Sequence, residues 1–265
     1  MQGRRKTMKS AIDGRVALVT GGGGAIGAAI ALALSDVGVA VAVADIDSDA
    51  ADRTVQQVHQ RGGSASSHVV DLSDLSALEG LISDVEDQME PIDILVNNAA
   101  VVGHSTILDG QESDWRHVLE LNLMAPWRLI QLVAGSMIDR GSGGNIVNVS
   151  SSSAFRALSA NGPYGVSKAG LVALTRGAAG ELGQHDINVN AVAPGVTRSP
   201  MTAAHIGGAD ALVAATKAGP LANLLGRPSE PEDVAAAVVF LSSPASRQIT
   251  AQVIHTSAGA VVGSA

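Results

Sequence analysis

The sequence contains no cysteine and very few aromatic residues. Without cysteine the chain cannot form disulfides, use a thiolate as nucleophile or hold zinc through sulfur. Aromatic residues make up 2% of the chain and hydrophobic residues 46%, so the core must be built from Ala, Val, Leu and Ile. Basic residues are also few, because 17 Lys and Arg stand against 25 Asp and Glu. The net charge of −8 disfavours contact with a nucleic-acid backbone, so no nucleic-acid partner is expected.

Long hydrophobic runs that could span a membrane are absent as well. The most apolar stretch, Ala25–Ala44, is interrupted by Ser35 and Asp36, and its pattern predicts a helix, a turn and a strand. Residues 1–11 are basic and contain no apolar segment, which indicates a flexible basic tail and not a secretion signal. We therefore expect a cytoplasmic protein with no membrane partner. We also expect one domain over residues 12–265, a length ordinary for an α/β domain.

Apolar, β-branched segments alternate with helical patterns along the whole chain. The predicted strands are Val16–Thr20, Val39–Ala44, His68–Val70, Ile92–Val96, Asn145–Ser150, Ile187–Val192 and Gln252–His255. The predicted helices are Gly27–Leu34, Ser48–Gln60, a helix capped by Ser73 that reaches Met89, Glu112–Met137 with a disturbance near Ala125–Pro126, Tyr164–Leu182 and Pro231–Leu241. This alternation predicts the α/β class, as a single-domain, Rossmann-like, doubly wound parallel sheet with helices on both faces. Ligands of such sheets bind beyond the carboxyl ends of the strands.

A glycine-rich turn, Thr20–Gly27, joins the first predicted strand to the first helix. Gly22, Gly24 and Gly27 match the spacing that lets bare backbone approach a pyrophosphate at a helix N-terminus. Asp45 ends the second strand about 20 residues later, where an acid can bind a ribose. No Lys or Arg lies between Asp45 and Ala51, which favours NAD over NADP. The alternatives without a cofactor are that the glycine-rich turn is only a flexible loop and that Asp45 is only a solvated acid at a strand end.

Tyr164 and Lys168 stand four residues apart at the start of a predicted helix, so they share one helix face. A phenol has a pKa of about 10, and a neighbouring ammonium favours its charged form. We therefore expect Lys168 to lower the pKa of Tyr164, which would suit proton transfer near neutral pH. The alternative is a tyrosine at a helix start with a solvated lysine. The serine-rich run Ser150–Ser153 ends the preceding strand on the same side of the sheet.

Several of these motifs agree in order and spacing with one enzyme family. They are Thr20–Gly27, Asp71, Asn97–Ala100, Asn122, Ser151, Tyr164 with Lys168, and Pro194–Ser199. With them the chain resembles the short-chain dehydrogenase/reductase family, from about residue 12 to about residue 258. The departures are conservative: Ala25, Ala100, Ala251 and residues 257–260 stand where the family is richer in glycine, and Ser199 replaces a threonine. We expect the Ala25 turn to be tighter and still able to bind.

The resemblance implies a catalytic set of four residues. Tyr164 would exchange a proton with the substrate oxygen, and Ser151 would hydrogen-bond that oxygen. Lys168 would bind the nicotinamide ribose, and Asn122 would order a water that links Lys168 to solvent. The implied NAD-binding residues are Gly21, Gly24, Ile26, Gly27, Asp45, Asp71, Leu72, Asn98, Ala99, Tyr164, Lys168, Pro194, Gly195, Val196 and Ser199. The expected partners are a small alcohol or ketone substrate and further copies of the chain.

We expect the copies to form a homo-oligomer, specifically a tetramer. This expectation comes from the resemblance, together with the apolar helix Val234–Leu241 and the apolar tail Ala258–Val262. No metal site is expected, because no two histidines stand four residues apart on a helix. The predicted activity is hydride transfer between NAD(H) and a secondary alcohol or ketone. Two alternatives remain: a methyltransferase, in which Tyr164 and Lys168 would have no role, and a non-catalytic NAD-binding regulator on the same fold. Nothing in the variable segment Ser199–Arg227 identifies the substrate.

Overall fold

The computed structural model of the protein describes residues 12–103, 105–156 and 162–262, and the predicted basic tail lies outside this part. At its centre is a seven-stranded parallel sheet of order β3-β2-β1-β4-β5-β6-β7. Its strands are β1 (Val16–Thr20), β2 (Ala40–Asp45), β3 (Ala65–Val69), β4 (Ile94–Asn97), β5 (Gly144–Val149), β6 (Ile187–Pro194) and β7 (Val253–Thr256). The strand order reverses between β1 and β4, which is where a doubly wound sheet binds its ligand.

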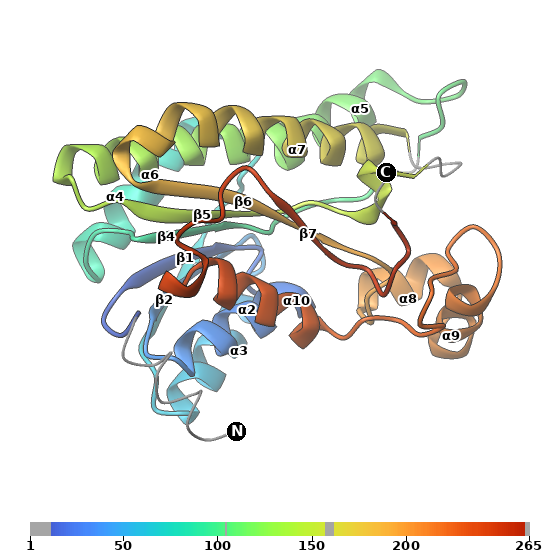
Figure 1. Ribbon diagram of the computed structural model, residues 1–265, viewed down its shortest axis with the longest axis horizontal. Coiled ribbons are helices and arrows are strands. Elements are labelled where there is room, and N and C mark those ends of the chain that lie inside the picture. Colours follow the sequence, from blue (N-terminus) through green and yellow to red (C-terminus); the bar gives the residue numbers. More distant parts are fainter. Residues whose placement is uncertain (1–11, 104, 157–161, 263–265) are drawn as a thin grey trace.

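Helices cover both faces of the sheet (Figure 1). One face carries α2 (Ala25–Ser35), α3 (Ser48–Gln60) and α10 (Pro231–Leu241). The other carries α4 (Leu78–Gln88), α6 (Ala125–Arg140) and α7 (Gly162–Leu182). The remaining helices are α5 (Glu112–Leu119), α8 (Pro200–Ile206) and α9 (Ala209–Lys217). The predicted fold class is confirmed.

The central strands β1, β2 and β4 are largely apolar because both of their faces are covered. In β1, Ala17 and Val19 pack toward α2 and α10, whereas Val16 and Leu18 pack toward the helices on the opposite face. Their side chains alternate between the faces as strand geometry requires. Aliphatic residues fill both cores, as the scarcity of aromatics predicted. Among the described residues no helix is long and apolar enough to cross a membrane.

The structure corrects several predicted boundaries. Asp74, and not Ser73, caps the turn before α4, because its carboxylate accepts a hydrogen bond from the Ser76 amide at 3.0 Å. The disturbance predicted near Ala125–Pro126 is a turn of π-helix at Glu120–Met124, and Pro126 stands in the first turn of α6. Proline cannot donate to the carbonyl four residues before it, so the irregular turn falls upstream. The weakly helical segment Ser199–Arg227 holds α8 and α9.

Candidate active site

A cavity of about 610 Å³ opens at the carboxyl ends of the strands and collects most of the predicted site residues. Those that line it are Gly21, Gly24, Ile26, Gly27, Asp45, Asp71, Leu72, Asn98, Ala99, Ser151, Tyr164, Lys168, Pro194, Gly195 and Ser199. Asn122 and Val196 are not among the lining residues. The cavity thus joins the glycine-rich turn after β1 to the tyrosine and lysine of α7.

The glycine-rich turn holds the start of α2 close to the strand ends. Gly21 has a φ of +62°, and a Cβ there would lie 2.8 Å from the Ala99 Cα. A Cβ on Gly27 would collide with the Gly21 carbonyl oxygen. Gly24 caps α2 without any side-chain hydrogen bond, and the first turn of the helix contains no acidic residue. The free amides of that turn can therefore receive an anion such as a phosphate, which fits a dinucleotide.

Asp45 is held in place by backbone amides. One carboxylate oxygen accepts a hydrogen bond from the Gly23 amide at 2.9 Å, and the other accepts from the Asp47 amide at 3.1 Å. Each oxygen keeps further acceptor capacity, so the carboxylate can still receive ribose hydroxyls. Of the described residues that line the cavity, Lys168 is the only Lys or Arg, and it comes from α7. Beside Asp45, the described lining of the cavity therefore supplies no Lys or Arg for a 2′-phosphate.

Asp71 is oriented by Ser73, which the sequence pattern predicted as a helix cap. The Ser73 hydroxyl and amide both donate to one Asp71 oxygen, at 2.6 and 2.9 Å. These hydrogen bonds, the hydroxyl's first, lower the pKa of Asp71, and the nearby charge of His117 adds to the effect. Asp71 is thus an ionised acceptor at the cavity wall.

Lys168 is fully enclosed in the cavity wall. Its side chain is 2% exposed, and its Nζ donates to the Val149 carbonyl at 2.8 Å. Burial lowers the pKa of Lys168 to about 7. The Nζ lies 5.7 Å from the centre of the Tyr164 ring, so the two side chains share one helix face as predicted.

The expected depression of the Tyr164 pKa by Lys168 is not found. Burial raises the pKa of the Tyr164 hydroxyl, and a hydrogen bond with Ser151 opposes this effect only in part. The ammonium lies over the ring, and with a pKa of about 7 it carries only part of a charge at neutral pH. Desolvation of the phenolate is therefore the larger influence.

Ser150 and Ser151, the first two serines after β5, have different partners. Ser151 bonds with the Tyr164 hydroxyl, and its own oxygen accepts from the Ser153 amide at 3.1 Å. Ser150 turns away and donates to the Lys168 carbonyl at 2.9 Å. The structure thus brings Ser151, and not Ser150, to the phenol.

Asn122 is completely buried behind the cavity in the π-helical turn. Its amide nitrogen donates to the Val101 carbonyl at 2.9 Å and to the Ser167 hydroxyl at 3.1 Å. Its amide oxygen accepts from the Val101 amide at 2.9 Å. Both donors of the side-chain amide are used, so a water ordered by Asn122 would have to be held by another group of this residue. Its backbone carbonyl lacks the usual α-helical donor four residues later, because residue 126 is a proline with no N–H.

Comparison with known proteins identifies the family to which the chain belongs. Residues 23–261 match a family model described as enoyl-(acyl carrier protein) reductase. The chain is 32% identical to the 3-oxoacyl-(acyl-carrier-protein) reductase FabG of Thermotoga maritima, over 95% of this chain and 99% of that protein. It is 33% identical to the galactitol 2-dehydrogenase of Agrobacterium fabrum, over 94% and 98% of the two chains. The chain belongs to the short-chain dehydrogenase/reductase family.

Solved structures agree with this assignment. A short-chain type dehydrogenase/reductase from Mycobacterium marinum superposes with a TM-score of 0.89 at 28% identity, covering 98% of this chain and all of the other. A protein assigned as an NAD(P)-dependent gluconate 5-dehydrogenase from Beutenbergia cavernae, whose crystal structure holds NADP at low occupancy, has a TM-score of 0.84 at 31% identity. It covers 94% of this chain and 97% of the other. As a short-chain dehydrogenase/reductase, the protein is an oxidoreductase of the alcohol and ketone class.

Some residues that line this dehydrogenase/reductase site were not predicted as binding or catalytic residues, although several of them stand inside the quoted motifs. They are Gly23, Ala25, Ile46, Val70, Ala100, Val101, His117, Leu121, Val149, Ser150, Thr197, Pro200 and Thr202. Most flank a predicted motif residue, and that adjacency was the available signal. His117 and Thr202 are different, because they come from α5 and α8 and reach the cavity only through packing. Ser199, which was predicted, accepts from the Thr202 amide at 3.1 Å and so also caps α8.

Proposed function

We propose that the protein is an NAD-dependent oxidoreductase that transfers a hydride between NAD(H) and a secondary alcohol or ketone, with Tyr164 as general acid and base. The observation that carries this proposal is the Tyr164 hydroxyl, bonded to Ser151 and close to Lys168, in the cavity that begins at the glycine-rich turn. A nicotinamide cofactor supplies or accepts the hydride when bound, and the protein provides orientation and proton transfer.

Each residue has a role that its surroundings support. Tyr164 exchanges a proton with the substrate oxygen, and Ser151 donates a hydrogen bond to that oxygen. Lys168 binds the nicotinamide ribose through Nζ and, as an ammonium, favours the phenolate. The backbone carbonyl of Asn122 holds the water that connects Lys168 to solvent. The rest of the implied set, from Gly21 to Ser199, holds the cofactor, with Val196 acting through its backbone behind the cavity surface.

The preference for NAD rests on Asp45. A 2′-phosphate adds roughly two negative charges beside this carboxylate, and the only Lys or Arg among the described residues that line the cavity is Lys168 on α7. After screening, the repulsion is on the order of 2–3 kcal/mol, or roughly 30- to 150-fold in affinity. We expect Asp45→Ala to lose efficiency with NAD(H) and to narrow the gap to NADP(H). Equal or better wild-type kcat/KM with NADP(H) would refute the role of Asp45.

The activity itself is tested with a panel of ketones and secondary alcohols, by following NADH oxidation or NAD⁺ reduction. The alternative, a non-catalytic regulator, predicts cofactor binding without turnover on any member of a broad panel. The bonded Tyr164 and Ser151 hydroxyls favour the enzyme, since a regulator has no need of a proton donor there. Binding is followed by calorimetry in parallel, so that the two outcomes are separable.

We also propose that the enzyme is a homo-oligomer, and a tetramer by resemblance. Its support is a groove of about 380 Å³ between α6 and α7, where Trp127 is 42% exposed. Most apolar positions of Val234–Leu241, counted earlier as support, are buried against the chain's own α2 and sheet, and of the large ones only Phe240, 37% exposed, is left to support it. Light scattering at micromolar concentration measures the state, and a monomer would contradict the proposal.

A further inference from the structure

Two hydrogen bonds cross the gap between the end of β5 and the catalytic turn of α7. In one direction, Lys168 Nζ donates to the Val149 carbonyl at 2.8 Å. In the other, the Ser150 hydroxyl donates to the Lys168 carbonyl at 2.9 Å. Because Val149 and Ser150 are neighbours in the chain, the two bonds close a ring through one peptide unit. Lys168 is thereby held at its backbone and at the tip of its side chain by the same strand end.

This ring is buried, so water and other protein groups compete little for its two hydrogen bonds. Ser150 is 3% exposed and Lys168 is 2% exposed. Within the described part of the chain, Val149 O is the only hydrogen-bond acceptor recorded for Lys168 Nζ. A lysine side chain has four rotatable bonds, so its tip is positioned only as well as the groups that receive it. Without the Ser150 bond, the strand end can shift away from the helix and weaken the Nζ contact.

We propose that Ser150 is a positioning residue, which holds the end of β5 against α7 so that Lys168 Nζ meets the Val149 carbonyl. The inference rests on the proposed function of Lys168 and goes beyond it, because it assigns a role to a serine whose hydroxyl bonds to the Lys168 backbone and not to the Tyr164 hydroxyl. It also gives each of two consecutive serines a separate role at this strand end, since Ser150 bonds to Lys168 and Ser151 to Tyr164.

The charge on Lys168 is sensitive to this contact. A hydrogen bond from the ammonium to a carbonyl favours the charged form, whereas burial opposes it and lowers the pKa to about 7. On its own helix the neighbouring titratable group is Tyr164. The end of β5 contributes only serines and backbone, and Asn122, from the π-helical turn, is neutral. Asp45, Asp71 and His117 line other parts of the cavity. Among the described residues, the Val149 carbonyl is therefore the one group that hydrogen-bonds to the ammonium.

The first test measures the Lys168 pKa directly in the protein without cofactor. The chain has only four lysines, so lysine labelled with ¹³C at Cε gives a simple NMR spectrum, and Lys168→Met identifies the signal. We expect Ser150→Ala to lower the Lys168 pKa by about half a unit or more, because the carbonyl contact is loosened. Ser150→Thr, which retains the hydroxyl, should restore the wild-type value. An unchanged or raised pKa in Ser150→Ala would overturn the inference.

Ser152→Ala is the matched control. Ser152 is similarly buried, at 7% exposed, but its hydroxyl makes no hydrogen bond within the described residues. We expect this variant to leave the Lys168 pKa unchanged, and an equal shift in both variants would indicate a general packing effect and defeat the proposal. If Ser150→Ala does not fold, Ser150→Cys provides the same size with a much weaker donor and must show the lowered pKa.

The second test uses turnover and separates this inference from the proposed function. In Ser150→Ala we expect kcat to fall about tenfold, with its pH profile displaced in the same direction as the Lys168 pKa and the substrate KM nearly unchanged. Wild-type activity with an unmoved profile in Ser150→Ala would refute the positioning role alone. Absence of turnover in the wild type refutes the proposed function, and the NMR titration still decides the position of Lys168.

Discussion

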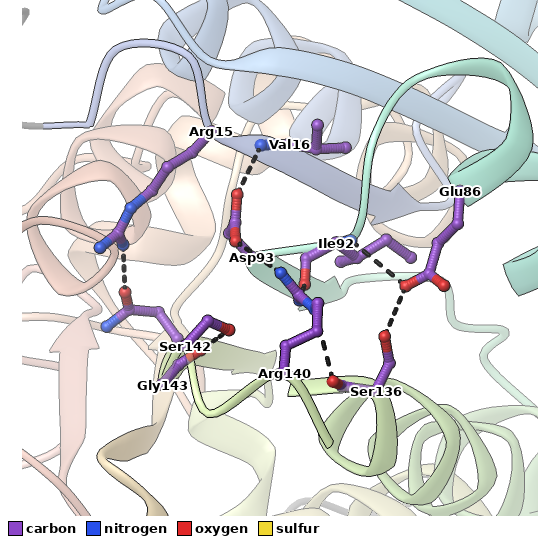
Figure 2. Close-up of polar contacts among 10 residues, drawn as sticks. Arg15, Val16, Glu86, Ile92, Asp93, Ser136, Arg140, Ser142 and Gly143 are labelled. Carbon is purple, nitrogen blue, oxygen red and sulfur yellow. Dashed lines mark hydrogen bonds and ion pairs between the residues drawn. The ribbon is translucent and has the colours of Figure 1, made fainter. Parts of the chain in front are cut away.

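At the amino ends of β1, β4 and β5, charged side chains fasten neighbouring segments together, whereas at the carboxyl ends Lys168 lies buried with no acidic partner among the described residues. At the amino end, Asp93 accepts from the Val16 amide at 3.1 Å and pairs with Arg140 at 3.4 Å (Figure 2). Arg140 in turn donates to the Ile92 carbonyl at 2.7 Å. Glu86 accepts from the Ser136 hydroxyl at 2.9 Å.

The charged residues at the amino ends and the buried lysine at the carboxyl ends therefore serve different purposes in one sheet. The charges at the amino end satisfy backbone groups and join α4 and α6 to the strands, so they stabilise the fold. Lys168 has only a carbonyl as partner, and burial of a charge without an opposite charge is destabilising. Such an arrangement persists where chemistry needs it. Substitutions at the carboxyl ends should therefore reduce activity without reducing stability, and substitutions at the amino ends should reduce stability without reducing activity.

The largest effect is expected from Tyr164→Phe. Loss of the phenol oxygen removes the proton donor and acceptor, which contributes about 10²- to 10⁴-fold in rate. Cofactor affinity and the unfolding midpoint should remain close to wild type, because the ring still packs in the cavity wall. Steady-state kinetics and calorimetric binding measure both quantities. Activity within tenfold of wild type would exclude Tyr164 as the general acid and base.

Lys168→Met should lower both turnover and cofactor affinity and yet stabilise the protein without cofactor. The pKa of Lys168 is about 7 in the folded protein and near 10.5 when unfolded, so the unfolded chain binds more protons between these values. Wild-type stability should therefore fall as the pH drops from about 10 toward 7, by at most about 1.4 kcal/mol per pH unit. Methionine removes this dependence. Urea unfolding across this pH range tests the prediction, and a wild-type curve as flat as that of the variant would contradict it.

At the amino end, Asp93→Ala should reduce stability and spare activity. The substitution leaves the buried Val16 amide without an acceptor and Arg140 without its ion pair, a loss of about 1–3 kcal/mol. Asp93→Asn keeps an acceptor for the amide, so its loss should be smaller. Thermal unfolding and kcat/KM at 25 °C measure both sides. A large fall in kcat/KM for either variant would show that the two ends of the sheet are not independent.

The fold was predictable because the sequence pattern and the packing agree at the central strands β1, β2 and β4. Strands buried on both faces are largely apolar, and the turn residues that follow them mark the ligand side of the sheet. The same logic found Asp45 and Asp71, which directly follow apolar segments. The irregular turn near Pro126 was expected, but its position was not, because a proline constrains the residues before it and does not choose among the available helical irregularities.

Contacts between elements distant in the chain were not predictable from the pattern. Four adjacent serines look alike in sequence, and only the position of α7 shows that Ser150 faces Lys168 while Ser151 faces Tyr164. The raised pKa of Tyr164 was also missed, because a spacing of four residues reveals a neighbouring ammonium but not the burial that outweighs it. In the same way, the apolar helix α10 gave no sign of whether its partner was α2 or another subunit.

The smallest effects are expected at the two ends of β7, where alanines take up a left-handed backbone. Ala251, before the strand, has a φ of 61°, and Ala258, after it, has a φ of 53°. Left-handed conformations strain a residue that has a Cβ, whereas glycine adopts them freely. Ala251→Gly and Ala258→Gly should each stabilise the protein by about 0.5–1 kcal/mol, after the added freedom of the unfolded chain is taken into account.

Ala218→Gly is the control, because Ala218 has an extended backbone with φ −150° and should only lose stability. Denaturant unfolding measures all three. Since Ala251 lies at the amino end and Ala258 at the ligand end, equal gains with unchanged kcat/KM would show that this strain serves no catalytic purpose, and a loss of activity confined to Ala258→Gly would tie it to the site.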